Sequence, residues 1–208
     1  GVSEIINDIF FFEFDKNGEM WLGTDRGIFV LREPEKFLSN DNVIFERVKI
    51  PRNDGTNLAD YLLSGIYTTA ICIDDANRKW IGTQNNGVFL LSEDGKETIH
   101  HFTEENSPLL SNYIQTIAIN SSTGSVFFGT SLGLIEYGGD ATEPENSLSE
   151  SNIEVYPNPV NPDFDGPVTI KGMSDKCTVR IVSASGSLVY QGYSNGGTFT
   201  WNVTDRNG

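Results

Sequence analysis

The sequence predicts an all-β protein in two parts: about three four-stranded antiparallel units, followed by a small β-sandwich. Three observations lead to this prediction. One sequence pattern occurs three times before residue 137, and glycine is abundant, at 21 of 208 residues. The segments between turns are short runs of β-branched and aromatic residues. No apolar run approaches the roughly 20 residues of a membrane-spanning helix, so we do not expect an integral membrane protein.

The repeated pattern is an aromatic residue, one further residue, Gly-Thr, and a second glycine three or four positions later. The pattern comprises Trp21, Gly23, Thr24 and Gly27 in the first copy, Trp80, Gly82, Thr83 and Gly87 in the second, and Phe127, Gly129, Thr130 and Gly133 in the third. The Gly-Thr pairs lie 59 and 47 residues apart, which suits a four-stranded unit. We expect the aromatic side chain to fill the space between stacked sheets, and the glycine to let a neighbouring backbone come close.

Each copy lies between further candidate strands. A β-branched or aromatic run precedes it, as at Ile9–Asp15, and an apolar run follows the second glycine. A fourth strand is expected at Val43–Lys49 in the first unit and at Thr98–Phe102 in the second, whereas the third unit shows none. One sheet cannot bury two apolar faces alone, so we interpret residues 1–137 as stacked blades of a β-propeller. Since propellers have four to eight blades, we expect the remaining blades upstream of residue 1.

These residues resemble a known repeat. The two-component regulator propeller repeat has an Asp-x-x-Gly turn, then Trp-Ile/Leu-Gly-Thr and a further glycine. Asp15–Gly18 followed by Trp21–Gly27 matches it closely, and so does Trp80–Gly87. The third copy departs from it, with Phe127 in place of tryptophan and no aspartate before Gly124.

A polar segment separates the two predicted parts. Residues 138–152 contain a single large apolar residue and are predicted to be an exposed linker. Residues 153–208 then show about five short strands at roughly ten-residue spacing, which predicts a small immunoglobulin-like β-sandwich. The closely spaced prolines between Pro157 and Pro162 exclude a helix there.

The start of this second part carries another resemblance. Tyr156, Pro157, Asn158, Pro159 and Val160, with the strand and turn residues that follow, resemble the C-terminal sorting domain of type IX secretion. Ser183–Gly186 replaces the Asp-x-x-Gly turn of that family, and the chain lacks the family's last strands. The resemblance implies an export address read by an outer-membrane translocon, with the product fixed to the cell surface.

Charge narrows the choice of partner. The formal net charge is −15, and 23 of the 29 acidic residues precede residue 150. An acidic chain repels phosphate backbones, so we do not expect nucleic acid to be a partner.

No residue pattern indicates catalysis. The chain lacks nucleophile-elbow, zinc-protease and phosphate-loop motifs, and we expect no catalytic residue, metal or cofactor. His100 and His101 are adjacent on an expected strand, so their side chains point to opposite faces. Cys72 and Cys177 lie in different predicted parts, so we expect no disulfide between them and expect both to be buried, small apolar side chains. Trp21 and Trp80 could stack on a glycan, but their repeat-equivalent positions favour the core.

The two resemblances together imply a non-enzymatic accessory protein of the type IX secretion system. It would lie on the extracellular face of the outer membrane, with secretion and attachment proteins as partners and lipopolysaccharide or another glycan as a further ligand. One alternative is the periplasmic ligand-sensing propeller of a hybrid sensor histidine kinase. A third is a secreted hydrolase that carries a sorting domain.

Overall fold

The computed structural model describes residues 8–39, 43–52, 55 and 58–204. The ends of both predicted parts, residues 1–7 and 205–208, therefore lie outside the described residues. The chain divides into two compact units. The first comprises residues up to 119 together with 126–137, and the second comprises 120–125 together with 138–208.

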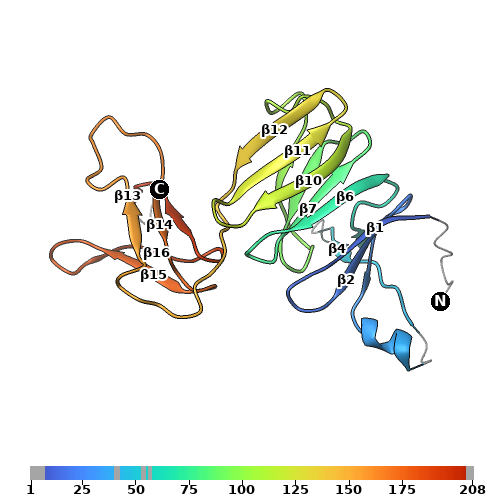
Figure 1. Cartoon of the computed structure of the whole chain (residues 1–208), viewed down its shortest axis with the longest axis horizontal. Coiled ribbons are helices and arrows are strands. Elements are labelled where there is room, and N and C mark those ends of the chain that lie inside the picture. The colour runs from blue at the N-terminus through green and yellow to red at the C-terminus, as the bar shows by residue number, and fades with distance from the viewer. Residues whose placement is uncertain (1–7, 40–42, 53–54, 56–57, 205–208) are drawn as a thin grey trace. The chain divides into compact units, whose positions relative to one another are not determined.

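The first unit contains three sheets that follow one another in chain order, coloured blue, green and yellow in Figure 1. We call them the first, second and third sheets. The first consists of β1 (Ile9–Phe14), β2 (Met20–Thr24) and β3 (Gly27–Leu31); the second of β6 (Thr68–Ile73), β7 (Lys79–Thr83), β8 (Val88–Leu91) and β9 (Thr98–Phe102); the third of β10 (Ile114–Asn120), β11 (Ser125–Thr130) and β12 (Gly133–Gly138). Each sheet is ordered as a meander.

Among the described residues, only the second of these three sheets has four strands. The prediction that Val43–Lys49 forms a fourth strand of the first sheet is therefore wrong. Only Glu46 of that segment pairs with β3, through two backbone hydrogen bonds to Val30 of 2.8 and 2.9 Å. The chain then leaves the sheet, because the carbonyl of Val48 accepts the amide of Leu62 at 2.9 Å. A separate two-stranded sheet forms there from β4 (Lys49–Pro51) and β5 (Ala59–Tyr61). A short 3-10 helix, η1 (Pro34–Leu38), lies between β3 and this segment.

The threonine and the second glycine, three or four positions later, are joined by the same local contact in all three copies. Each threonine hydroxyl donates to the carbonyl of the second glycine, at 2.8 Å from Thr24, 2.8 Å from Thr83 and 2.9 Å from Thr130. The glycine itself has a positive φ, +108° at Gly27 and +70° at Gly87, a region that side chains rarely adopt. The motif therefore closes the turn between the second and third strands.

Most of the core of the first unit lies between its sheets, while a smaller buried cluster of Leu22, Phe29 and Leu31 lies on the other face of the first sheet. Between the first and second sheets a buried cluster forms, with Trp21, Ile28, Val30, Val48, Leu62, Ile81, Phe89 and Leu91 as members. A second cluster lies between the second and third sheets and includes Trp80, Val88, Leu90, Ile114, Ile117, Val126 and Phe128. The second sheet thus packs on the first sheet with one face and on the third with the other.

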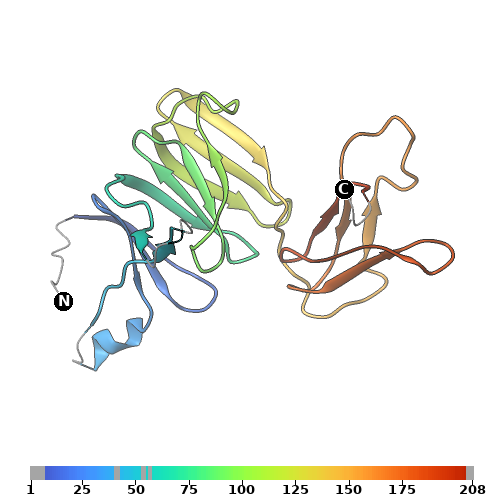
Figure 2. The same ribbon diagram turned by 180° about the vertical axis from the view of Figure 1, so that it is seen from behind.

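The second unit has two small sheets. One is ordered β13 (Glu154–Tyr156), β14 (Val168–Lys171) and β17 (Phe199–Trp201); the other is the hairpin of β15 (Thr178–Val182) and β16 (Leu188–Tyr193), which Figure 2 shows as a long arm. The Phe199 ring packs against Tyr190 with centroids 6.2 Å apart. The predicted linker belongs largely to this unit, since Ala141 and Thr142 are buried and the Glu145 amide donates to Met173 at 2.9 Å.

Candidate functional site

The structure places the predicted repeat aromatics in different environments. Trp21 and Trp80 are fully buried between sheets, whereas Phe127 of the third sheet is only half-buried. Trp80 is surrounded by aromatic rings, with Phe128 and Tyr137 both at 5.5 Å between centroids. The first two aromatics are therefore packing residues and offer no surface to a ligand.

A buried ion pair lies beside Trp21. Lys79 Nζ is 3.0 Å from a carboxylate oxygen of Asp15, and both side chains are inaccessible to solvent. The same ammonium donates to the carbonyl of Asn77 and lies 4.7 Å from the Trp21 ring centre. The Trp21 indole N–H donates to Asp15 at 3.2 Å. Burial lowers the pKa of Lys79, and the hydrogen bond to Asp15 opposes this shift. Every group is satisfied, so the pair ties the first sheet to the second.

The equivalent position in the second sheet is built differently. Asp74, the counterpart of Asp15, accepts from Arg78 Nε of its own turn at 2.7 Å. Burial raises the pKa of Asp74, while the Arg78 charge acts in the opposite direction. Among the described residues the buried Trp80 indole nitrogen has no hydrogen-bond partner. The second-to-third interface is therefore apolar where the first-to-second one carries charges.

Exposed aromatic side chains gather where the first strands of the sheets begin. Phe10 stacks on Tyr67 with ring centroids 4.4 Å apart, and Tyr113 holds the position equivalent to Tyr67 in the next repeat. These three side chains are 39–41% exposed. Desolvation, and then the charges of Asp8 and Asp25, raise the pKa of the Tyr67 phenol. We call this set the aromatic rim; it combines ring faces with hydroxyl and carboxylate oxygens, groups that can stack on and hydrogen-bond to a sugar or a peptide.

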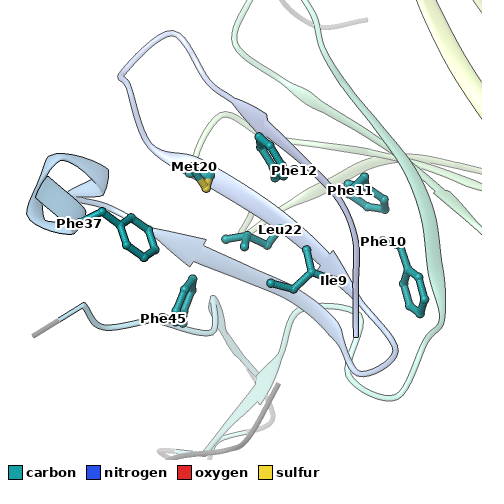
Figure 3. Close-up of a pocket in the computed structure, with 8 residues that line it drawn as sticks. All are labelled: Ile9, Phe10, Phe11, Phe12, Met20, Leu22, Phe37 and Phe45. Carbon is teal, nitrogen blue, oxygen red and sulfur yellow. The ribbon is translucent and has the colours of Figure 1, made fainter. Parts of the chain in front are cut away.

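An apolar groove of about 660 Å³ lies on the outer side of the first sheet, and Ile9, Phe10, Phe11, Phe12, Met20, Leu22, Phe37 and Phe45 line it. Figure 3 shows Met20 and Leu22 along its floor, with Phe37 and Phe45 on one side and Phe12 on the other. Leu22 is buried, but Phe12 and Phe37 are 60% and 53% exposed. Such large exposed aromatic side chains in one place indicate a contact surface.

The predicted sorting motif lies at an exposed edge of the second unit. Tyr156 ends β13, and the peptide bonds before Pro157 and Pro159 are both cis. Lys171 Nζ lies 5.5 Å from the Tyr156 ring centre, and Val160 is 39% exposed. The five motif residues are therefore available at the surface, in line with recognition by another molecule.

The remaining candidate residues come together in no reactive arrangement. Cys72 and Cys177 are free thiols, and burial, followed by the Glu13 and Asp74 charges, raises the pKa of Cys72 to about 11. His101 stacks on Phe89 with ring centroids 3.9 Å apart, while His100 contacts Phe102. Within the part of the chain that the structure describes, no group of three or more histidine, cysteine or acidic side chains could hold a metal ion.

Sequence reasoning did not identify either the groove or the aromatic rim. A signal for the groove was present in the run Ile9–Phe12, because alternation in an ordinary strand leaves one side polar. Three consecutive phenylalanines on a first strand indicate that both faces of that strand meet apolar surroundings. Phe37 and Phe45 could not be added from sequence, because they come from an irregular connection.

No protein-family model and no curated protein matches the chain. Among solved structures the chain is similar to PorZ of Porphyromonas gingivalis, described as an essential surface component of that bacterium's type IX secretion system. The two are 35% identical, with a TM-score of 0.67 over 96% of this chain. The chain spans about a quarter, 26%, of that structure's length.

Two further solved structures are extracellular domains from B. thetaiotaomicron, described as parts of hybrid two-component systems. The first is 20% identical to this chain over 96% of it, with a TM-score of 0.48, and the match spans 29% of that structure's length. The second is 16% identical over 94% of this chain, with a TM-score of 0.44, and the match spans 24% of its length. In the described ranges, no helix is both long and apolar enough to cross a membrane.

Proposed function

We propose that the chain is part of a PorZ-like accessory protein of a type IX secretion system, acting on the cell surface by binding rather than by catalysis. The observation that carries this proposal is the 35% identity to PorZ along 96% of the chain. The two-component domains share 20% identity or less and have TM-scores below 0.5. They therefore do not support the alternative that the chain is the ligand-sensing propeller of a sensor histidine kinase.

Within this proposal the three sheets of the first unit are blades of a β-propeller, and the second unit is an immunoglobulin-like sorting domain. Two features support these assignments. The sheets stack face to face through equivalent residues, and the Tyr156–Val160 motif lies exposed at a sheet edge. The second unit would act as the export or attachment signal.

The aromatic rim is the proposed contact for a surface polysaccharide or a partner protein. Its carboxylates and the net charge of −15 disfavour anionic phosphate groups. The rim instead suits the neutral parts of a glycan, on which tyrosine rings can stack. We expect Tyr113→Ala to weaken binding of isolated surface polysaccharide about tenfold by calorimetry, because one stacking platform is lost. Tyr193→Ala, also an exposed tyrosine but in the second unit, is the matched control and should bind normally.

Deletion of the gene in the source bacterium tests the secretion role itself. We expect type IX cargo to be exported and anchored poorly in the deletion strain, and a plasmid copy of the gene to restore both steps. Immunoblots of cell-surface and culture fractions measure the effect. Normal export, processing and anchoring of cargo in the deletion strain would overturn the proposal.

A further inference from the structure

Two carboxylates stand at the aromatic rim where the other repeats carry uncharged residues. The threonine of the Gly-Thr pair is paired with Ile9 in the first sheet and with Thr68 in the second. Asp8, directly before Ile9, therefore holds the position of Tyr67, directly before Thr68. In the first sheet a carboxylate thus takes the place of a tyrosine.

Asp25 is the second of these carboxylates. It directly follows the threonine of the first copy, whereas Gln84 and Ser131 follow the threonines of the other two copies. The hydroxyl-to-carbonyl bond that closes the turn forms in all three copies. The turn therefore does not require a carboxylate at this position.

The two carboxylates are neighbours across the first hairpin. Ile9 is paired with Thr24, so Asp8 and Asp25 form the next pair of the same antiparallel register. Like charges opposite each other on neighbouring strands destabilise a sheet. Among the described residues, Asp25 Oδ1 is buried without a hydrogen-bond partner, and Asp25 Oδ2 lies 3.9 Å from Arg26 Nε, beyond hydrogen-bond distance. A cation with N–H donors would compensate this pair.

Two aromatic rings lie beside the carboxylates. The Thr68 hydroxyl donates to the Thr24 carbonyl at 3.1 Å, which brings Tyr67 next to the turn that carries the second carboxylate. Phe10 stacks on Tyr67 with ring centroids 4.4 Å apart, and the two side chains are 40% and 39% exposed. Desolvation, followed by the charges of the two carboxylates, raises the pKa of the Tyr67 phenol, in agreement with this proximity. We call these two aromatic and two acidic residues the acidic corner of the rim.

We propose that the acidic corner binds a protonated amino sugar of a surface polysaccharide, with the sugar ring against the stacked aromatic pair and its ammonium group between Asp8 and Asp25. The argument is charge complementarity. An ammonium group has three N–H donors for carboxylate oxygens, and aromatic ring faces attract cations. The sugar ring itself adds an apolar face for the aromatic rings and hydroxyl groups for the Tyr67 phenol. The inference rests on the proposed function, because it names the chemical class of the polysaccharide proposed for the rim.

Calorimetry with two matched oligosaccharides tests the role of the amine. The probes are the tetramer of glucosamine and the tetramer of N-acetylglucosamine, in which acetylation removes the positive charge. At pH 6 the free amines are protonated, and physiological salt screens general attraction between exposed charges. We expect the glucosamine tetramer to bind at least about tenfold more tightly than the acetylated one, since only the former forms charge-assisted hydrogen bonds.

Variants then test the two carboxylates. Asp25→Asn and Asp8→Asn should each reduce the preference for the glucosamine tetramer at least about threefold, because each removes one charged acceptor. Asp163→Asn is the matched control, since it removes the same charge from an exposed position in the second unit and should retain the full preference. Circular dichroism checks that all three variants fold.

Four outcomes would overturn the proposal. Equal losses in Asp25→Asn and Asp163→Asn would show only the general attraction of an acidic chain for a polycation. Equal binding of the two tetramers would exclude a role for the amine, and so would binding of neither. Tetralysine that binds as tightly as the glucosamine tetramer, with the same dependence on Asp25, would assign the acidic corner to a basic segment of a protein instead. Because the assay uses purified protein, its failure is distinct from normal cargo export in the deletion strain, and polysaccharide binding that still depends on Tyr113 would leave the proposed function intact.

Discussion

At the scale of single residues, the buried Asp15–Lys79 pair shows how a polar contact is tolerated between two apolar sheets. The carboxylate accepts from the amides of Asn17 and Glu19 as well as from Trp21. Taking two charges out of water costs several kcal/mol per ion, and their attraction offsets this only when the other hydrogen bonds are made as well. Removing one partner of the pair should therefore destabilise the folded protein more than removing both.

We predict that Asp15→Asn lowers the free energy of unfolding by roughly 3–5 kcal/mol, because it leaves a buried ammonium uncompensated. Lys79→Met should cost less, because Asp15 keeps its backbone and indole donors. The double variant should be more stable than Asp15→Asn alone. Urea denaturation of all four proteins gives the coupling energy, and additive effects of the two substitutions would contradict the account.

Cys72 is predicted to be a slow thiol because its pKa is raised to about 11. At pH 8 the thiolate would be about one part in a thousand of the total, against about a quarter for a free cysteine. Alkylation of native Cys72 should therefore be about 200-fold slower than in the urea-unfolded chain. Since the folded pKa lies above the unfolded one, this residue's contribution to stability is lost as pH rises from about 9 towards 11.

The Glu13 charge contributes to this shift, so Glu13→Gln should lower the pKa of Cys72 and speed its alkylation. Mass spectrometry separates the modification of Cys72 from that of Cys177. A rate that does not change in Glu13→Gln would mean that burial and the Asp74 charge protect the thiol without Glu13.

At the scale of elements, the turn that the Gly-Thr motif closes admits no side chain at its second glycine. A Cβ at Gly87 would lie 2.0 Å from the Phe102 carbonyl oxygen, with φ at +70°. Gly18 has a similar φ of +79°, but nothing lies within 4 Å of its Cβ position. A side chain at Gly18 would therefore meet backbone strain alone, whereas one at Gly87 would meet both backbone strain and a steric clash.

We predict that Gly18→Ala costs about 1 kcal/mol from the positive φ alone. Gly87→Ala should cost clearly more, because the β8–β9 pairing has to shift as well. Thermal unfolding of both variants measures the difference. Equal losses would show that the close approach of Phe102 relaxes without cost.

The same elements show how far the sequence could predict the fold. Strands with strong β-branched or aromatic runs lie where expected, for example Ile9–Asp15, which contains β1, and Thr98–Phe102, which is β9. The pairing of Val43–Lys49 could not be predicted from sequence, because its alternation of apolar residues suits pairing with β3 and pairing with the segment after it equally well. The hydrogen bond from the Leu62 amide to the Val48 carbonyl favours pairing with the later segment. No local sequence pattern predicts this long-range contact.

At the scale of the whole molecule, the sequence pattern predicted two parts with the first ending at residue 137, but not that residues 138–152 belong to the second unit. Residues 138–152 are polar in composition, yet Thr142 is buried with its hydroxyl 2.6 Å from that of Thr198. Small polar residues can be internal when they bond to one another, and composition alone does not reveal this. For the same reason the groove, which draws Phe37 and Phe45 from an irregular connection, became visible only in three dimensions.

The Asp15–Lys79 pair also bears on how such a chain can evolve. Repeats that stack through equivalent apolar faces could in principle be duplicated or exchanged without regard to order. Lys79, however, tolerates only a predecessor that supplies a carboxylate at the position of Asp15. Recombination that placed the second repeat behind a different one would bury a lone ammonium and destabilise the protein. A single ion pair thus determines which repeat can precede the second one.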